Sequence, residues 1–141
     1  MDIYTAYYPK CTDLVEKYHC CPVSIAGKAP NGFAYPEYKK LAPSWSIWKE
    51  WHDSTDPYKD YRYQIRYVTE ILSNIDVREV VDELNSLRIA YNESRGTNLI
   101  DVALICYERP ENFCHRHIVG EWLKLKLPEM YAGEHDYERI D

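Results

Sequence analysis

The chain has 141 residues, of which 45% are hydrophobic and 28% charged, and a net charge of -6 at pH 7. This composition is typical of one globular domain, so we expect residues 1–141 to form a single domain with a core at about 2–127 and an acidic tail at 128–141. The net charge argues against broad binding to duplex nucleic acid, which depends on many Lys and Arg side chains.

No stretch approaches the roughly 20 apolar residues that cross a bilayer, and the opening residues, MDIYTAYYPK, lack the layout of a signal peptide. We therefore expect no membrane association and a cytoplasmic location, which is the host cytoplasm if the chain is encoded by a phage. The five cysteines are an odd number without a secretion signal, so we predict free thiols.

The first third of the chain predicts a β-α-β unit. Residues 3–8 (IYTAYY) are β-branched and aromatic and are followed by Pro9, which indicates a short strand. A brief helix is expected over 12–18 and a second strand over 23–26. Residues 28–43 contain Gly32 and three prolines and predict a long extended loop, of a length that commonly serves a function.

The middle of the chain predicts three helices. Ser44 caps a short one that runs to about Trp51. From Tyr58, apolar residues recur at three- and four-residue spacing and predict an amphipathic helix with the stripe Tyr61, Ile65, Val68, Leu72 and Ile75. Asp76 caps the next helix and Gly96 ends it, and its buried stripe is expected to be Val77, Val80, Val81, Leu84, Leu87 and Tyr91.

The last third of the chain contains the most strongly predicted strand. Residues 99–107 (LIDVALICY) are almost continuously apolar, as in a strand covered on both faces. A loop at 108–113 leads to a helix over about 115–127 that Pro128 stops, with Ile118, Val119, Trp122 and Leu123 facing inward. We expect the acidic tail after Tyr131 to be frayed. Strands that alternate with helices predict an α/β layered domain with a mainly parallel sheet.

The candidate site lies at the end of this late strand. Ligands bind beyond the carboxyl ends of parallel strands, where Cys106 and Glu108 fall two residues apart and so point to one side. Cys114, His115 and Arg116 begin the following helix, whose N-terminus favours anions. Arg116 offers a planar fork for a phosphate or carboxylate, and the same surroundings would lower the pKa of Cys114.

Purely structural roles would also explain the residues of this candidate site. Cys106 is compatible with a small core residue, because free cysteine is among the most buried residue types. Glu108 and Arg116 are compatible with an ion pair across the loop, and Cys114 with a residue that only caps the helix.

These residues also resemble a known family. The string ALICYERPENFCHRHIVGEWL at 103–124 resembles the C-terminal signature of the DUF488 family, in which a strand ends in Cys-x-Glu and the next helix opens with Cys-His-Arg. IYTAYY at 3–8, SIAGKAP at 24–30 and LAPSW at 41–45 resemble the upstream pieces of its short, phage-type and bacterial members. The resemblance covers about residues 2–127.

The resemblance implies a Rossmann-like three-layer α/β fold but no reaction. It also implies that one ligand-binding pocket is formed by Ser24, Lys28, Ser44, Trp45, Cys106, Glu108, Cys114, His115 and Arg116. Where many members have a strand ending in Asp-Val-Arg, this chain has Ser24-Ile25-Ala26, so any role of that acidic-basic pair is absent.

Three functions compete. The first is a pocket for a nucleotide or other phosphate-bearing small molecule, with Arg116 and Lys28 at the phosphate and Trp45 stacked on the base; in a phage it would act as a sponge for a host immune signal. The second is a thiolate enzyme acting on a nucleotide or nucleic-acid-related substrate, with Cys114 or Cys106 as nucleophile, His115 or Glu108 as base, and Arg116 stabilising negative charge.

The third function is zinc binding by some of His19, Cys20, Cys21, Cys106, Cys114, His115 and His117. No Cys-x-x-Cys pair exists, and the adjacent Cys20 and Cys21 are poorly spaced for chelation, so we predict neither a metal site nor a cofactor.

Trp45, Trp48 and Trp51 recur every three residues, a spacing that favours a core-facing stripe; we expect Trp48 and Trp51 in the core and keep Trp45 as a pocket residue. The sequence is compatible with a homo-oligomer and does not decide the point.

Overall fold

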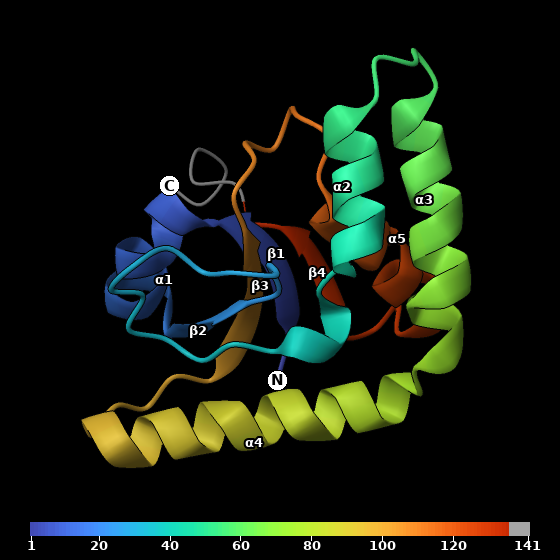
Figure 1. The fold of residues 1–141 in the computed structure, drawn as a ribbon. Helices are drawn as coiled ribbons and strands as arrows, with labels where there is room; N and C mark the ends of the chain where they lie inside the picture. Colours follow the sequence, from blue (N-terminus) through green and yellow to red (C-terminus); the bar gives the residue numbers. More distant parts are fainter. Residues whose placement is uncertain (136–141) are drawn as a thin grey trace.

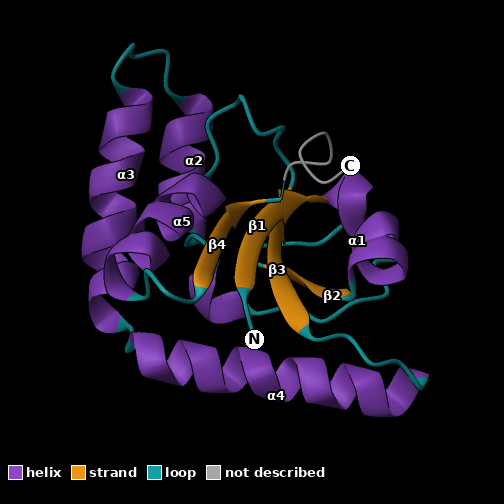
Figure 2. Ribbon diagram, turned by 180° about the vertical axis from the view of Figure 1, so that it is seen from behind, coloured by secondary structure: helices purple, strands orange, loops and turns teal. Residues whose placement is uncertain are grey.

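Four parallel strands form the centre of the computed structural model, which describes residues 1–135. The strands are β1 (Ile3–Tyr7), β2 (Cys20–Ser24), β3 (Asp101–Cys106) and β4 (Tyr131–Glu134), in the sheet order β2-β3-β1-β4. Figure 2 shows this order from behind. Because helices flank the sheet, the predicted Rossmann-like three-layer α/β fold is confirmed.

The helices follow the predicted chain order, with shifted ends. They are α1 (Cys11–Tyr18), α2 (Trp45–Asp53), α3 (Lys59–Glu70), α4 (Val77–Arg95) and α5 (His115–Lys126). Short 3-10 turns lie at η1 (Tyr8–Lys10), η2 (Lys39–Leu41) and η3 (Leu72–Asn74). Within the described residues, no helix is both long enough and apolar enough to cross a bilayer.

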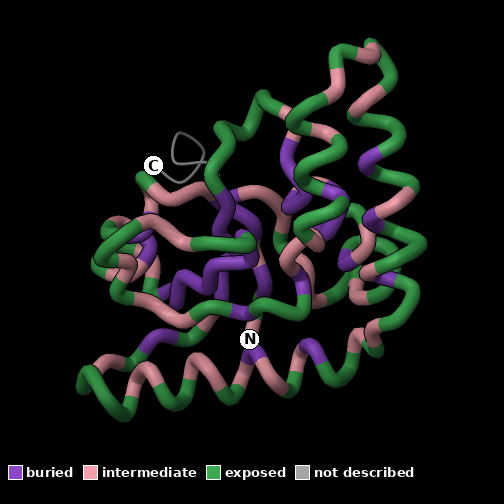
Figure 3. Tube along the Cα trace, in the orientation of Figure 1, coloured by how far each residue is buried: buried purple, intermediate pink, exposed green. Residues whose placement is uncertain are grey.

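The alternation of side chains along the strands divides the core into two layers. Ile3, Val23 and Leu104 face the layer of α3, α4 and α5, whereas Ala6 and Ile105 face α1 and the aromatic loop that follows β2. Both faces of the sheet are therefore covered, and the strands appear as buried segments in Figure 3. This burial explains the continuous apolar character of residues 102–105.

The predicted start, end and buried stripe of helix α4 are confirmed. The Asp76 side chain accepts a hydrogen bond from the Arg78 amide at 2.9 Å, and Gly96 ends the helix in the left-handed region at φ 67°. The predicted stripe packs against the core, with Val80 and Leu84 completely buried. In Figure 1 this helix runs along the lower side of the domain.

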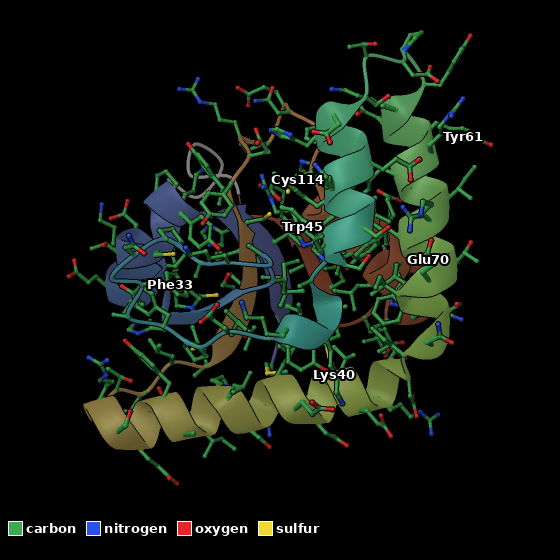
Figure 4. All side chains as sticks on the ribbon, in the orientation of Figure 1. Phe33, Lys40, Trp45, Tyr61, Glu70 and Cys114 are labelled. Atoms are coloured by element: carbon green, nitrogen blue, oxygen red, sulfur yellow. The ribbon has the colours of Figure 1, made fainter. Side chains whose placement is uncertain are left out.

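The stripe predicted for the preceding helix is wrong at Tyr61, Ile65 and Val68, whereas Leu72 and Ile75, which follow α3 (Lys59–Glu70), do pack against the core. Tyr61 is 64% exposed and Ile65 and Val68 are also exposed, while the buried residues of α3 are Tyr63 and Tyr67. Figure 4 shows Tyr61 pointing away from the domain. A tyrosine can bury its ring and keep a partner for its hydroxyl, as Tyr67 does with the Leu41 carbonyl oxygen at 2.5 Å. The aromatic face therefore packs inward in place of the aliphatic one.

Two other predicted boundaries are wrong. The second strand covers residues 20–24 rather than 23–26, so Cys20 and Cys21 belong to it. The tail is not frayed throughout, because Tyr131–Glu134 forms β4 and pairs with β1. Gly120 permits this docking, since a Cβ atom there would lie 2.5 Å from the Tyr131 hydroxyl oxygen. The rest of the predicted tail, residues 136–141, lies outside the described residues.

Candidate functional site

A cavity of about 540 Å³ opens at the carboxyl ends of the strands. The segments that follow β2 and β3 line one side, α2 and Tyr63 of α3 line the other, and the start of α5 closes the space between them. The labelled side chains of Trp45 and Cys114 mark this region in Figure 4, between the sheet and α2. Its position is the one expected for a ligand site in a parallel sheet.

One side of the cavity is aromatic. Trp45, Trp48 and Trp51 follow one another along α2, whose fully buried residue is Ile47. The Trp45 and Trp48 rings stack with centroids 5.1 Å apart, and the Trp51 ring stacks on Phe113 at 5.8 Å. These rings present flat apolar surfaces to the cavity, an arrangement suited to planar ligands.

The prediction for Trp48 and Trp51 needs correction. Trp48 is 37% exposed and lines the cavity, and Trp51 packs partly against the core and also lines the cavity. The three-residue spacing correctly indicated one helical face, but that face meets the cavity. Trp45 is 69% exposed, which means that packing within this chain does not account for its position.

Opposite the tryptophans lies a cluster of two sulfurs and an imidazole. Cys106 is the last residue of β3, Cys114 is the N-cap residue of α5, and His115 is its first residue. All three side chains are buried and line the cavity. The two Sγ atoms and a ring nitrogen of His115 lie within 4.8 Å of one another, so a loop of seven residues brings the two cysteines together.

The orientation of the His115 ring is determined by two contacts. Its Nε2 lies 2.8 Å from the Ile25 carbonyl oxygen, which can only accept a hydrogen bond, so Nε2 carries the proton. Nδ1 lies 3.5 Å from Cys106 Sγ. In the neutral ring, Nδ1 therefore presents its lone pair to the cysteines.

The two thiols have opposite acidities. A hydrogen bond from Cys106 lowers the pKa of Cys114 well below its usual range, and the Arg116 backbone amide and a His115 ring protonated at both nitrogens act in the same direction. The bond to Cys114 and burial raise the pKa of Cys106. The pair therefore holds one proton, with Cys114 as thiolate and Cys106 as thiol.

Arg116 occupies a different place from the one its predicted role requires. It is fully buried and is not part of the cavity lining. Its Nε and Nη2 atoms donate to the Glu134 carboxylate at 3.2 and 3.0 Å, and Nη1 donates to the Glu108 carbonyl oxygen at 2.5 Å. The ion-pair alternative is thus correct in kind, but the carboxylate belongs to Glu134 rather than to Glu108.

Ser24 is also absent from the cavity lining. Its hydroxyl bonds to the Tyr8 hydroxyl at 2.6 Å and accepts from the Ala26 amide at 3.3 Å, which shapes the turn after β2. The other predicted residues do line the cavity: Lys28, Ser44, Trp45, Cys106, Glu108, Cys114 and His115. Ser44 also caps α2 as predicted, accepting from the Ile47 amide at 3.2 Å.

Several residues line the cavity without having been predicted from the sequence. Tyr63 and Phe113 complete the aromatic side, and their rings meet edge to face at 5.2 Å. Tyr107 donates a hydrogen bond to the Lys28 carbonyl oxygen at 2.5 Å and so connects the loops after β3 and β2. The available signal for Tyr107 and Phe113 was their position in the loop between Cys106 and Cys114.

A family model described as "Active DUF488-N3 subclade" matches residues 23–127. The chain belongs to the DUF488 family. This confirms the resemblance seen in the sequence, and the match includes both cavity cysteines and His115. No curated protein and no solved structure matches this DUF488 chain.

Proposed function

We propose that this DUF488 protein binds a small planar ligand of the nucleotide type in the cavity at the carboxyl edge of its sheet. The observation that carries the proposal is the tryptophan side of the cavity, in particular the 69% exposed ring of Trp45. A volume of about 540 Å³ lies within the range of small-molecule sites. A base lying against the indole rings would bury them without any rearrangement of the core.

The internal pairing of Arg116 changes the proposed phosphate contact. Lys28 lines the cavity and is exposed, so its ammonium group can reach a phosphate at the cavity mouth. Arg116 would have to leave Glu134 to do the same. We therefore assign the phosphate to Lys28 and leave Arg116 a supporting role beneath the site.

The experiment combines native mass spectrometry for a co-purified ligand with a binding screen of bases, nucleosides and mono-, di- and cyclic nucleotides, read by tryptophan fluorescence. We expect Trp45→Ala to weaken binding of the best ligand about 10-fold or more, in line with the value of one base-aromatic stack. Tyr61→Ala is the matched control, because Tyr61 is similarly exposed but lies on α3 outside the cavity lining.

Lys28 can be tested with the same ligands. Lys28→Ala should weaken binding of a nucleotide but not of its nucleoside, whereas Lys49→Ala, on the outer part of α2, should change neither. A wild-type protein that binds no member of the screen, or equal binding by wild type and Trp45→Ala, would overturn the proposal. Binding without turnover would make the protein a sponge, and product formation would make it an enzyme.

The cysteine pair favours a second candidate function. Cys114 and Cys106 adjoin His115 inside the proposed ligand cavity, which is the arrangement of a thiolate that attacks a bound substrate. Cys114→Ser should then abolish turnover of any ligand that the screen finds, while the ligand still binds. Turnover that persists in Cys114→Ser would exclude Cys114 as the nucleophile.

A further inference from the structure

The distances within the cysteine and histidine cluster match those of a metal site. With zinc–sulfur bonds of about 2.3 Å and zinc–nitrogen bonds of about 2.0–2.1 Å at tetrahedral angles, a sulfur and a nitrogen ligand lie about 3.5 Å apart, and two sulfurs about 3.8 Å. Here Cys106 Sγ lies 3.5 Å from His115 Nδ1, and the two Sγ atoms and a ring nitrogen of His115 lie within 4.8 Å of one another. Only small side-chain movements are needed to coordinate one ion.

We propose that Cys106, Cys114 and His115 bind a single zinc-type divalent ion whose fourth coordination position faces the cavity. The inference goes beyond the proposed function, because it does not depend on which planar ligand the cavity accepts. Three protein ligands with one position left for water or a substrate atom is the pattern of a reactive metal centre rather than of a purely structural one.

The second contact of His115 supports the assignment. A histidine that binds a metal usually donates its other ring N–H to a carbonyl or carboxylate, which fixes the ring and its tautomer. His115 makes this contact already, because Nε2 donates to the Ile25 carbonyl oxygen at 2.8 Å. Nδ1 is thereby directed toward the two sulfurs as a ligand atom.

Charge and ligand type determine which metal the site accepts. Two thiolates and one neutral imidazole carry a charge of about -2, so a divalent ion makes the buried cluster neutral. Sulfur ligands favour zinc over magnesium or calcium, which prefer oxygen. The charge of Arg116 beneath the cluster is already balanced by Glu134, so it adds no net charge to the site.

The fold also explains why the other predicted zinc ligands do not take part. Cys20 and Cys21 are neighbours in β2, and they belong to core clusters on opposite faces of the sheet. Among residues 1–135, the cluster of Cys106, Cys114 and His115 is the group of Cys, His or carboxylate side chains that is close enough to hold one ion. Glu108 lines the same cavity but is exposed and is not part of this cluster.

Titration of the reduced, chelator-treated full chain with Co²⁺ tests the site. We expect a sulfur-to-cobalt charge-transfer band that saturates at one ion per chain and is displaced by Zn²⁺. Competition with a chromophoric chelator then gives the zinc affinity. Cys106→Ser, Cys114→Ser and His115→Ala should each weaken it by about 100-fold or more, since even supporting residues of such sites contribute 10–100-fold. The control Cys21→Ser should bind zinc as the wild type does.

A measurement on the wild type avoids the risk that a variant fails to fold. Zn²⁺ should protect Cys106 and Cys114 from alkylation and leave the rates of Cys11, Cys20 and Cys21 unchanged. The absence of the charge-transfer band, or equal zinc affinity in Cys114→Ser and Cys21→Ser, would overturn the metal site. Neither result would affect the nucleotide screen, so the two proposals fail separately.

Discussion

The buried cysteines lie in two regions that differ in their neighbours rather than in their exposure. Cys11, Cys20 and Cys21 lie among apolar side chains around β2 and α1, whereas Cys106 and Cys114 lie beside His115 at the cavity. All five are free thiols and at most 6% exposed. Burial raises the pKa of Cys11 and of Cys21 to about 12, whereas hydrogen bonding lowers that of Cys114.

This contrast shows what a reactive cysteine requires in this fold. Burial alone penalises the thiolate and makes a thiol inert. At the cavity, a thiol donor, an imidazole and a helix N-terminus converge on Cys114 and outweigh the same penalty. The position of a cysteine at a strand end, next to a helix start, therefore matters more than its depth.

The largest expected difference between the two regions is in the pH profile of alkylation of the metal-free protein. Because Cys114 is a thiolate at and below neutral pH, its rate should stay nearly constant between pH 5 and 8. The rates of Cys11 and Cys21 should rise about 10-fold per pH unit over the same range, since their thiolate fractions do. Iodoacetamide labelling with peptide mass spectrometry measures all five rates together. A 10-fold rise per unit at Cys114 would remove the distinction.

The next largest expected effect is on stability and comes from Arg116. The buried charge of this residue interacts with Cys106 and Cys114 and not with the cysteines of the other region. Arg116→Ala leaves the Glu134 carboxylate unpaired and should lower the free energy of unfolding by about 3 kcal/mol, the lower end for breaking a buried pair. Urea unfolding followed by circular dichroism measures the loss. A loss near zero would show that the pair does not hold β4 against α5, and Glu134→Gln provides the reciprocal variant.

The pH dependence of stability sharpens the comparison further. The lowered pKa of Cys114 adds stability that is present above the unfolded value of about 8.5 and is lost as pH falls. The raised pKa of Cys21 has the opposite sign, since its contribution is present below about 8.5 and lost at higher pH. Each contributes at most about 1.4 kcal/mol per pH unit.

Cys114→Ser should therefore flatten the rise in the free energy of unfolding between pH 6 and 8, and Cys21→Ser should flatten its decline above pH 9. Urea unfolding at several pH values, on metal-free protein, gives both slopes. If the free energy of unfolding depends on pH with the same slope in the wild type and in both variants, the pKa values of Cys114 and Cys21 are not shifted in opposite directions.

The smallest expected effect is on the stability of the cavity wall. Trp45 is mostly exposed, so Trp45→Ala should change the free energy of unfolding by about 0.5 kcal/mol or less. The same variant is expected to lose ligand affinity, and thermal unfolding with and without ligand separates the two effects. If Trp45→Ala greatly lowers the free energy of unfolding in the absence of ligand, the role of Trp45 is to stabilise the fold rather than to bind the ligand.

The predictions from sequence were most accurate where a local signal determined the structure. The apolar run at 99–107, which contains β3 (Asp101–Cys106), the cap at Asp76 and the stop at Gly96 depend on near neighbours, and the structure confirms the strand, the cap and the stop. The position of Cys114 and His115 at a helix start also followed from local spacing, and the parallel topology then placed Cys106 beside them.

The errors arose where distant contacts decided the structure. Arg116 looked like a free fork because its partner, Glu134, was placed in a frayed tail, and nothing near residue 131 indicates pairing with β1. The buried face of α3 depended on which helices lie beside it, so Tyr63 and Tyr67 displaced the aliphatic stripe. The pattern of Trp48 and Trp51 identified a helical face but not the cavity beside it.

The position of β1 inside the sheet has a consequence for how the chain reaches its native state. This strand is synthesised before both of its neighbours, which are β3, about a hundred residues later, and β4, later still. During translation, Ile3–Tyr7 therefore lacks its native partners until β3 (Asp101–Cys106) and β4 (Tyr131–Glu134) have emerged. Such long-range pairing is slow and exposes apolar strand edges in the meantime. The assembly of the described sheet, and with it the cavity at the end of β3, must wait for β4.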